Sequence, residues 1–267
     1  MAVETGFAEV DDGRLYYEIA GTGPPLVFLH GFTLDTRMWD DQFAHFADRH
    51  RVLRYDMRGF GRSTLPTEAP FSNHDDLRAL LDHHGIDRAH LCGLSSGGGT
   101  AIDLALEDPG RVLSLVLISS ALGGVPGVGS MGPTVAAMYA AGAAGDLTGA
   151  RKLWVGSALF APATRDPGVA GRLRDMVDTW SGWHLTHEAN HVDPDPVPAG
   201  RLATLVAPTL LMTGELDEVP PMIAAKIEDE APDAHHVVVP DVGHMANMEA
   251  PDVVNGHIAR FLAGLDH

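Results

Sequence analysis

The sequence predicts an α/β protein with a mostly parallel sheet of eight strands and helices on both faces. Short apolar runs alternate with helical patterns along most of the chain, which is typical of parallel sheets covered by helices. Several of these runs are continuously apolar, as expected for strands buried on both faces. Polar residues that could take part in catalysis or binding directly follow several of these runs. In open α/β sheets, functional groups gather at the carboxyl ends of strands.

The first two predicted strands form a hairpin around the Asp-Gly turn at Asp12 and Gly13. The predicted strands are 7–10, 15–20, 26–29, 51–55, 89–92, 112–118, 209–213 and 237–239. Predicted helices lie between them, at 39–46, 98–106, 147–160, 169–180, 222–231 and 253–262. A further helix, capped by Ser72 or Asn73, is expected to end at Gly85.

Residues 121–200 have a different pattern. They contain no strand-like run, they are rich in Ala and Gly, and they hold three of the four tryptophans. This segment is predicted to be a helical cap inserted into a core made of residues 1–120 and 201–267. Trp154, Trp183 and Met138 of the cap are the expected pocket residues.

Composition excludes some classes of partner. The formal charge of −18 over 267 residues argues against binding to nucleic acid or to anionic membranes, which need basic patches. The N-terminus lacks the pattern of a signal peptide and no apolar run is long enough to cross a bilayer, so a cytoplasmic protein is expected. Cys92 is the single cysteine and is expected to be a small buried core residue. A homo-oligomer is compatible with the sequence.

The segment Gly93-Leu94-Ser95-Ser96-Gly97 matches G-x-S-x-G and lies between a predicted strand and a predicted helix. That context is the one required by a nucleophile elbow, a strained turn that raises a serine above a sheet. Side chains two positions before or after the nucleophile would collide with backbone, so glycine is needed there. Ser95 has glycine at both of these positions, Gly93 and Gly97. Ser96 has Leu94, not glycine, two positions before it. Ser95 is therefore the predicted nucleophile.

Candidate partners for the serine follow later strands. His244 comes after the last predicted strand, and Asp217 comes after the strand before it. The order Ser, Asp, His differs from that of two other common serine hydrolase architectures. Glu215, Glu218 and Asp241 compete with Asp217 for the role of the acid.

Five motifs in order resemble the α/β-hydrolase superfamily, in particular small esterases, enol-lactonases and cofactor-free haloperoxidases or perhydrolases. They are His30-Gly31-Phe32, residues 56–63, residues 93–98, residues 214–217 and Gly243-His244. The resemblance implies an α/β-hydrolase fold without cofactor or metal. It also implies Ser95 as nucleophile, His244 as general base and acid, and Asp217 as the orienting acid. The backbone N–H groups of Phe32 and Ser96 would form the oxyanion hole.

These residues predict hydrolysis of a small-molecule carboxylic ester or lactone through an acyl-serine intermediate. C–C bond hydrolysis and perhydrolysis remain open because they use the same triad. A non-catalytic ligand-binding protein with this fold also remains open. Haloalkane dehalogenases and epoxide hydrolases are disfavoured, because they have aspartate where Ser95 stands.

Three other sequence patterns are not expected to form a catalytic, metal or cofactor site. Residues 187–191 match the zinc-protease pattern H-E-x-x-H, but prolines follow and no third ligand is in place. Residues 127–132 match a dinucleotide fingerprint but lack the acidic residue that normally follows. Residues 58–62 are predicted to be a structural turn, and His30 is expected to shape the loop that carries Phe32.

Overall fold

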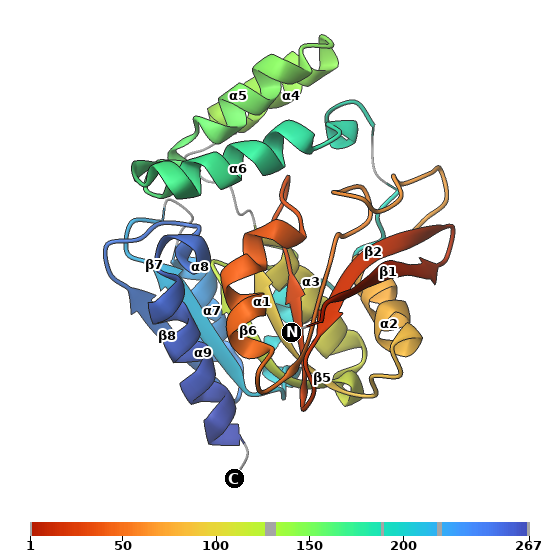
Figure 1. Ribbon diagram of the computed structural model, residues 1–267, viewed down its shortest axis with the longest axis vertical. Helices are drawn as coiled ribbons and strands as arrows, with labels where there is room; N and C mark the ends of the chain where they lie inside the picture. Colours follow the sequence, from red (N-terminus) through yellow and green to blue (C-terminus); the bar gives the residue numbers. More distant parts are fainter. Residues whose placement is uncertain (1, 126–131, 188–189, 218–220, 266–267) are drawn as a thin grey trace.

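The computed structural model describes residues 2–125, 132–187, 190–217 and 221–265, and within them eight strands form one sheet (Figure 1). The strands are β1 (Glu4–Val10), β2 (Gly13–Ala20), β3 (Pro25–Leu29), β4 (Arg51–Tyr55), β5 (Ala89–Leu94), β6 (Val112–Ile118), β7 (Thr209–Gly214) and β8 (Ala234–Val239). Their order is β1-β2-β4-β3-β5-β6-β7-β8. The β1–β2 hairpin and the β2–β4 pair are antiparallel, and the other pairs are parallel. The predicted fold class is confirmed.

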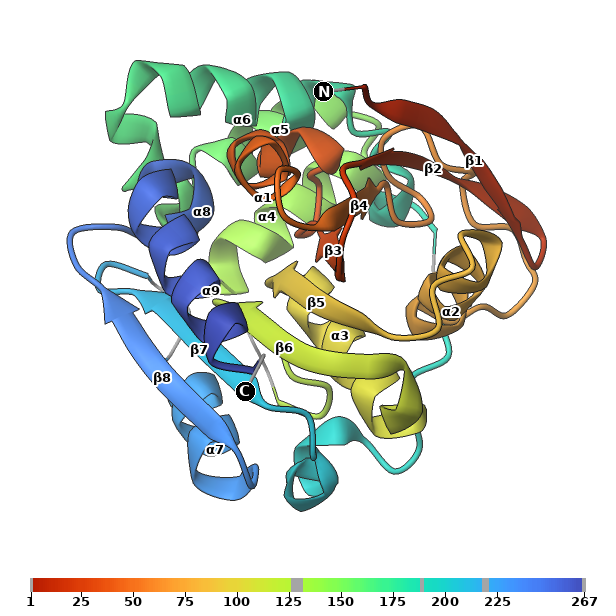
Figure 2. The same ribbon diagram turned by 60° about the horizontal axis from the view of Figure 1, so that its bottom comes forward.

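Helices cover both faces of the sheet (Figure 2). On one face, α1 (Asp40–Phe46) packs against α9 (Pro251–Leu265) and α8 (Ala246–Glu249). The other face carries α2 (Asn73–His83), α3 (Ser96–Glu107) and α7 (Met222–Glu230). The side chain of Ser72 accepts the Asp75 N–H, so Ser72 rather than Asn73 caps α2.

Several elements differ from the sequence prediction; β1, for example, begins at Glu4, three residues before its predicted start. The helix predicted at 147–160 ends at Val155, and a short 3₁₀ turn follows. Helix α4 (Gly132–Ala143) was not predicted, because its Ala-rich sequence has no clear apolar face. Strand β8 begins at Ala234, three residues before the predicted start. The prediction missed these residues because two histidines follow Ala234 and interrupt the apolar pattern of this edge strand.

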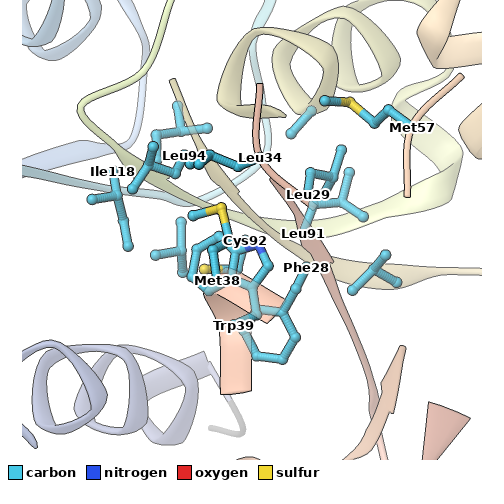
Figure 3. Close-up of a cluster of buried hydrophobic side chains, with 14 of the residues drawn as sticks. Phe28, Leu29, Leu34, Met38, Trp39, Met57, Leu91, Cys92, Leu94 and Ile118 are labelled. Carbon is cyan, nitrogen blue, oxygen red and sulfur yellow. The ribbon is translucent and has the colours of Figure 1, made fainter. Parts of the chain in front are cut away.

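The central strands form the deepest part of the core. Every residue of β5 is buried, and the Phe28 ring of β3 lies 5.1 Å from the Trp39 ring, centroid to centroid. Figure 3 shows Met38, Trp39 and Cys92 among the clustered side chains between these segments. Cys92 is fully buried, as predicted. This dense packing fixes the strand ends on which the site residues lie.

Helices α4, α5 (Leu147–Val155) and α6 (Pro167–Thr179) form a separate layer beyond one end of the sheet (Figure 1). All three belong to the segment predicted as a cap, although the boundaries at residues 120 and 201 stay a prediction. The α6 residue Arg172 forms an ion pair with Asp41 of α1 at 2.8 Å, which ties this layer to the sheet domain. Among the described residues, none of the helices combines the length and apolar character needed to cross a bilayer.

The start of α3 lies unusually close to β3. A Cβ atom on Gly97 would lie 2.3 Å from the backbone oxygen of Leu29, whereas a Cβ on Gly99 would meet its first neighbour at 3.6 Å. We expect Gly97→Ala to lower the free energy of unfolding by about 2 kcal/mol, because backbone must move to admit the methyl group. Gly99→Ala, in the same helix, is the control and should be neutral or stabilising. Urea denaturation measures both, and equal stabilities would contradict the close approach.

Candidate active site

Ser95 lies in the sharp turn between β5 and α3. Its φ of 53° and ψ of −118° place a non-glycine residue in a strained conformation. Three backbone hydrogen bonds hold it there: its N–H donates to Ile118 O at 3.0 Å, and its carbonyl accepts the N–H groups of Ala121 at 2.9 Å and Gly99 at 3.1 Å. A Cβ on Gly93 would lie 2.5 Å from backbone atoms of Gly97, so this glycine is required. The Ser95 side chain makes no capping bond to α3.

His244 and Asp217 form a buried pair. The imidazole Nδ1 lies 3.1 Å from each carboxylate oxygen of Asp217, and the two side chains are 4% and 3% exposed. A carboxylate accepts hydrogen bonds, so Nδ1 carries the proton and Nε2 is left as a proton acceptor.

The competing carboxylates are placed differently. Glu215 accepts a hydrogen bond from the Asp241 backbone N–H at 3.1 Å. Glu218 lies outside the described residues. The geometry therefore brings Asp217, among the described candidates, to the histidine.

Glu249 supports the loop that carries His244. Its carboxylate accepts the N–H groups of Gly243 at 2.9 Å and Met245 at 3.1 Å, the residues on either side of His244. Burial raises the pKa of Glu249, against the lowering effect of these two hydrogen bonds. The sequence offers no signal for this role, because it depends on how α8 folds back toward the loop.

The predicted oxyanion donors have no hydrogen-bond acceptor in the part of the protein that the structure describes. Among the described residues, none accepts a hydrogen bond from the backbone N–H of Phe32 or of Ser96. Both residues line the same cavity as Ser95. The neighbouring Thr33, with φ of 67°, accepts a 2.7 Å hydrogen bond from Trp154 Nε1 of α5. The cap therefore fixes the loop that presents the Phe32 N–H.

Ser95 and His244 open into one cavity of about 260 Å³. Its apolar wall consists of Phe32, Leu34, Leu94, Ala121, Val135, Met138, Leu159, Phe160, Ile223 and Met245, with the rings of Tyr139 and Trp154. Its remaining described lining residues are Gly31, Ser95, Ser96, Ser119, Ser120 and His244, so the described wall contains no Lys, Arg, Asp or Glu. Such a cavity is suited to a compact apolar ligand with few polar groups.

Two of the three expected pocket residues line this cavity, and the third lies elsewhere. Met138 and Trp154 line the cavity. Trp183 is absent from the described lining residues, because its ring stacks on His187 at 4.7 Å with an interplanar angle of 5°. Trp180 instead contacts the Phe32 ring, with centroids 5.4 Å apart.

His30 has the structural role expected of it. Its Nε2 accepts the Met57 N–H at 2.8 Å, so its Nδ1–H donates to Gly31 O at 2.8 Å. Burial lowers the pKa of His30 and keeps the ring neutral, as both bonds require. Arg58 forms two hydrogen bonds with the buried Asp76 carboxylate, at 2.8 and 2.6 Å, which supports the structural interpretation of residues 58–62.

The two remaining patterns lie partly outside the described residues. In the H-E-x-x-H segment, Glu188 is not described, and His191 lies against Phe71 and within 3.1 Å of Asp193. Of the glycine-rich segment at 127–132, only Gly132, the first residue of α4, is described.

Residues 24–251 match the family model described as the alpha/beta hydrolase fold. The chain belongs to this family. A dihydrolipoyllysine-residue acetyltransferase component of the acetoin cleaving system from Pseudomonas putida is 30% identical over 277 residues, covering 94% of this chain and 67% of that protein. The 3-oxoadipate enol-lactonase 1 of Acinetobacter baylyi is 25% identical over 86% of this chain and 85% of its own length.

Solved structures agree with this α/β hydrolase assignment. Est816, described as an N-acyl homoserine lactone degrading enzyme, has a TM-score of 0.78 and 29% identity, covering 96% of this chain and 100% of that chain.

The support of the histidine loop by Glu249 can be tested by denaturation. Glu249→Ala leaves the buried N–H groups of Gly243 and Met245 without an acceptor, and we expect a loss of about 2 kcal/mol in unfolding free energy. Glu249→Gln keeps one acceptor oxygen and should lose less. An alanine variant as stable as the parent protein would show that the two hydrogen bonds contribute nothing.

Proposed function

We propose that this α/β hydrolase cleaves uncharged carboxylic esters or lactones, with Ser95 as nucleophile, His244 as general base and acid, and Asp217 as the orienting acid. The observation that carries the proposal is the shared cavity: Ser95 and His244 line it together, and Asp217 holds the far nitrogen of His244. The relatives named as an enol-lactonase and a lactone-degrading enzyme support the same chemistry.

Catalysis would proceed in two steps. Ser95 Oγ attacks the carbonyl carbon while His244 Nε2 takes its proton, and the C–O bond to the alcohol then breaks as His244 returns that proton to the leaving oxygen. A water molecule, deprotonated by His244, then attacks the acyl-serine, the C–O bond to Ser95 breaks, and His244 returns the proton to Ser95 Oγ as the acid leaves. The N–H groups of Phe32 and Ser96 would stabilise the oxyanion, each contributing on the order of 3 kcal/mol in the transition state.

Asp217 would act through His244. Its carboxylate fixes the tautomer in which Nε2 is unprotonated, and its charge stabilises the imidazolium that forms when Ser95 loses its proton. Burial of both side chains strengthens this interaction, because water does not screen it.

The chemistry of the cavity favours uncharged substrates. A carboxylate in this apolar space would lose its hydration without gaining a cationic partner, which costs several kcal/mol. The undescribed segments 126–131 and 218–220 contain no Lys or Arg either. A neutral lactone such as the one named for Est816 therefore fits the cavity better than the carboxylate-bearing compound named for the enol-lactonase.

The nucleophile is tested by paired serine variants. Ser95→Ala should reduce turnover of p-nitrophenyl butyrate by about 10⁴-fold or more and abolish labelling by a fluorophosphonate probe. Ser96→Ala keeps the backbone N–H that the mechanism uses and should retain most of the activity. Undiminished turnover in Ser95→Ala, or loss in Ser96→Ala alone, would contradict the assignment.

The preference for neutral substrates is tested with two esters of equal chain length. We expect the kcat/KM for p-nitrophenyl hexanoate to exceed that for mono-p-nitrophenyl adipate by roughly 100-fold, because the second compound buries a carboxylate. Steady-state kinetics at pH 7.5 gives both values. Equal or reversed values would show that the cavity accepts a negative charge.

A further inference from the structure

We propose that Ser119 is a positioning residue for the triad, and that its hydroxyl group holds the Asp217 carboxylate through one buried water molecule. This inference rests on the proposed function, because it assigns Ser119 to the same catalytic machinery. The observations that carry it are the position of Ser119 in the backbone, its unpaired hydroxyl and a small cavity that it shares with Asp217.

The backbone places Ser119 between the nucleophile segment and the acid segment. It directly follows Ile118, whose carbonyl accepts the Ser95 N–H at 3.0 Å. Its own N–H donates to Met212 O of β7 at 2.8 Å, and β7 leads to the turn that carries Asp217. Ser119 is thus fixed on both sides by bonds that also fix the two catalytic segments.

Ser119 has features that packing alone does not require. Its φ is 45°, a conformation that costs non-glycine residues on the order of 1 to 3 kcal/mol. The residue is 4% exposed, and its Oγ is buried without a hydrogen-bond partner among the described protein groups. A buried hydroxyl without a partner, in a residue with a strained backbone, calls for an explanation.

The neighbouring hydroxyl groups are already engaged. Ser120 Oγ donates to Ala121 O at 2.7 Å, and Thr213 Oγ1 lies 2.8 Å from His236 Nε2. Ser119 therefore differs from Ser120 and Thr213, the other hydroxyl residues of the small cavity, since its hydroxyl donor remains available.

A second cavity, of about 10 Å³, connects Ser119 with Asp217. Both residues line it, and much of its wall is apolar, from residues such as Leu117, Leu211 and Ile223. This space can hold about one water molecule, which needs polar partners to remain in such a place. The Ser119 hydroxyl and the Asp217 carboxylate provide a donor and an acceptor there.

The consequence for the reaction is orientational. Each donor that bonds to a carboxylate restricts its rotation, and a fixed carboxylate plane keeps the bond to His244 aligned. Ser119 would therefore affect the rate of the chemical step through Asp217 and would leave substrate binding unchanged.

A double-mutant cycle tests this role. Ser119→Ala should lower kcat for p-nitrophenyl butyrate roughly five-fold with KM unchanged, because one hydrogen bond to a charged group is lost. In an Asp217→Ala background, the same change should have no further effect. Thr213→Val is the matched control: Thr213 lines the small cavity but is not among the described residues of the substrate cavity, and its hydroxyl is engaged with His236, so kcat should stay unchanged.

A second readout does not depend on turnover. The Nδ1 proton of His244 can be followed by NMR, and its resonance should shift in Ser119→Ala but not in Thr213→Val. If the parent protein hydrolyses no ester, the proposed function fails while this measurement still decides the role of Ser119. The inference is overturned by an unchanged resonance, by a change confined to KM, or by an equal loss of kcat in both Asp217 backgrounds.

Discussion

The parallel hydrogen-bond ladder continues beyond the ends of the strands, and the arrangement of the candidate site depends on it. Ser95 N–H bonds to Ile118 O, Ser119 N–H bonds to Met212 O, and Glu215 N–H bonds to Val239 O at 2.9 Å. Each bond joins the residue just after one strand to the neighbouring strand. The elbow, the acid turn and the histidine loop are consequently held in register by the sheet, although none of them is part of a strand.

The catalytic candidates could be predicted because their positions follow from strand ends and local turns. Glycines on both sides select Ser95, and the order of Asp217 and His244 along the chain reflects adjacent strands. The pocket was less predictable. Trp183 and Trp154 look equivalent in sequence, but only the three-dimensional path of the cap turns Trp154 toward Thr33 and stacks Trp183 on His187.

Other contributions leave no trace in the sequence. Ser119 is one of many serines, and its unusual backbone angle and unpaired hydroxyl become visible only in the folded chain. Glu249 supports the His244 loop through backbone N–H groups, which any sequence provides. Helix α4 lacks a distinct apolar face, and its residues are buried where neighbouring cap helices pack against it.

The hydrogen bond from Trp154 to Thr33 means that the cap both lines the pocket and holds the loop beside Phe32, so an exchange of the cap affects both. A designer who replaced the cap with that of a relative, in order to accept a new substrate, would also remove this bond to the loop that carries Phe32, the proposed oxyanion donor. Selectivity and speed would then change together, since one indole ring both shapes the pocket wall and restrains Thr33 beside the Phe32 N–H. Cap exchange in this protein therefore requires a tryptophan, or an equivalent donor, at position 154.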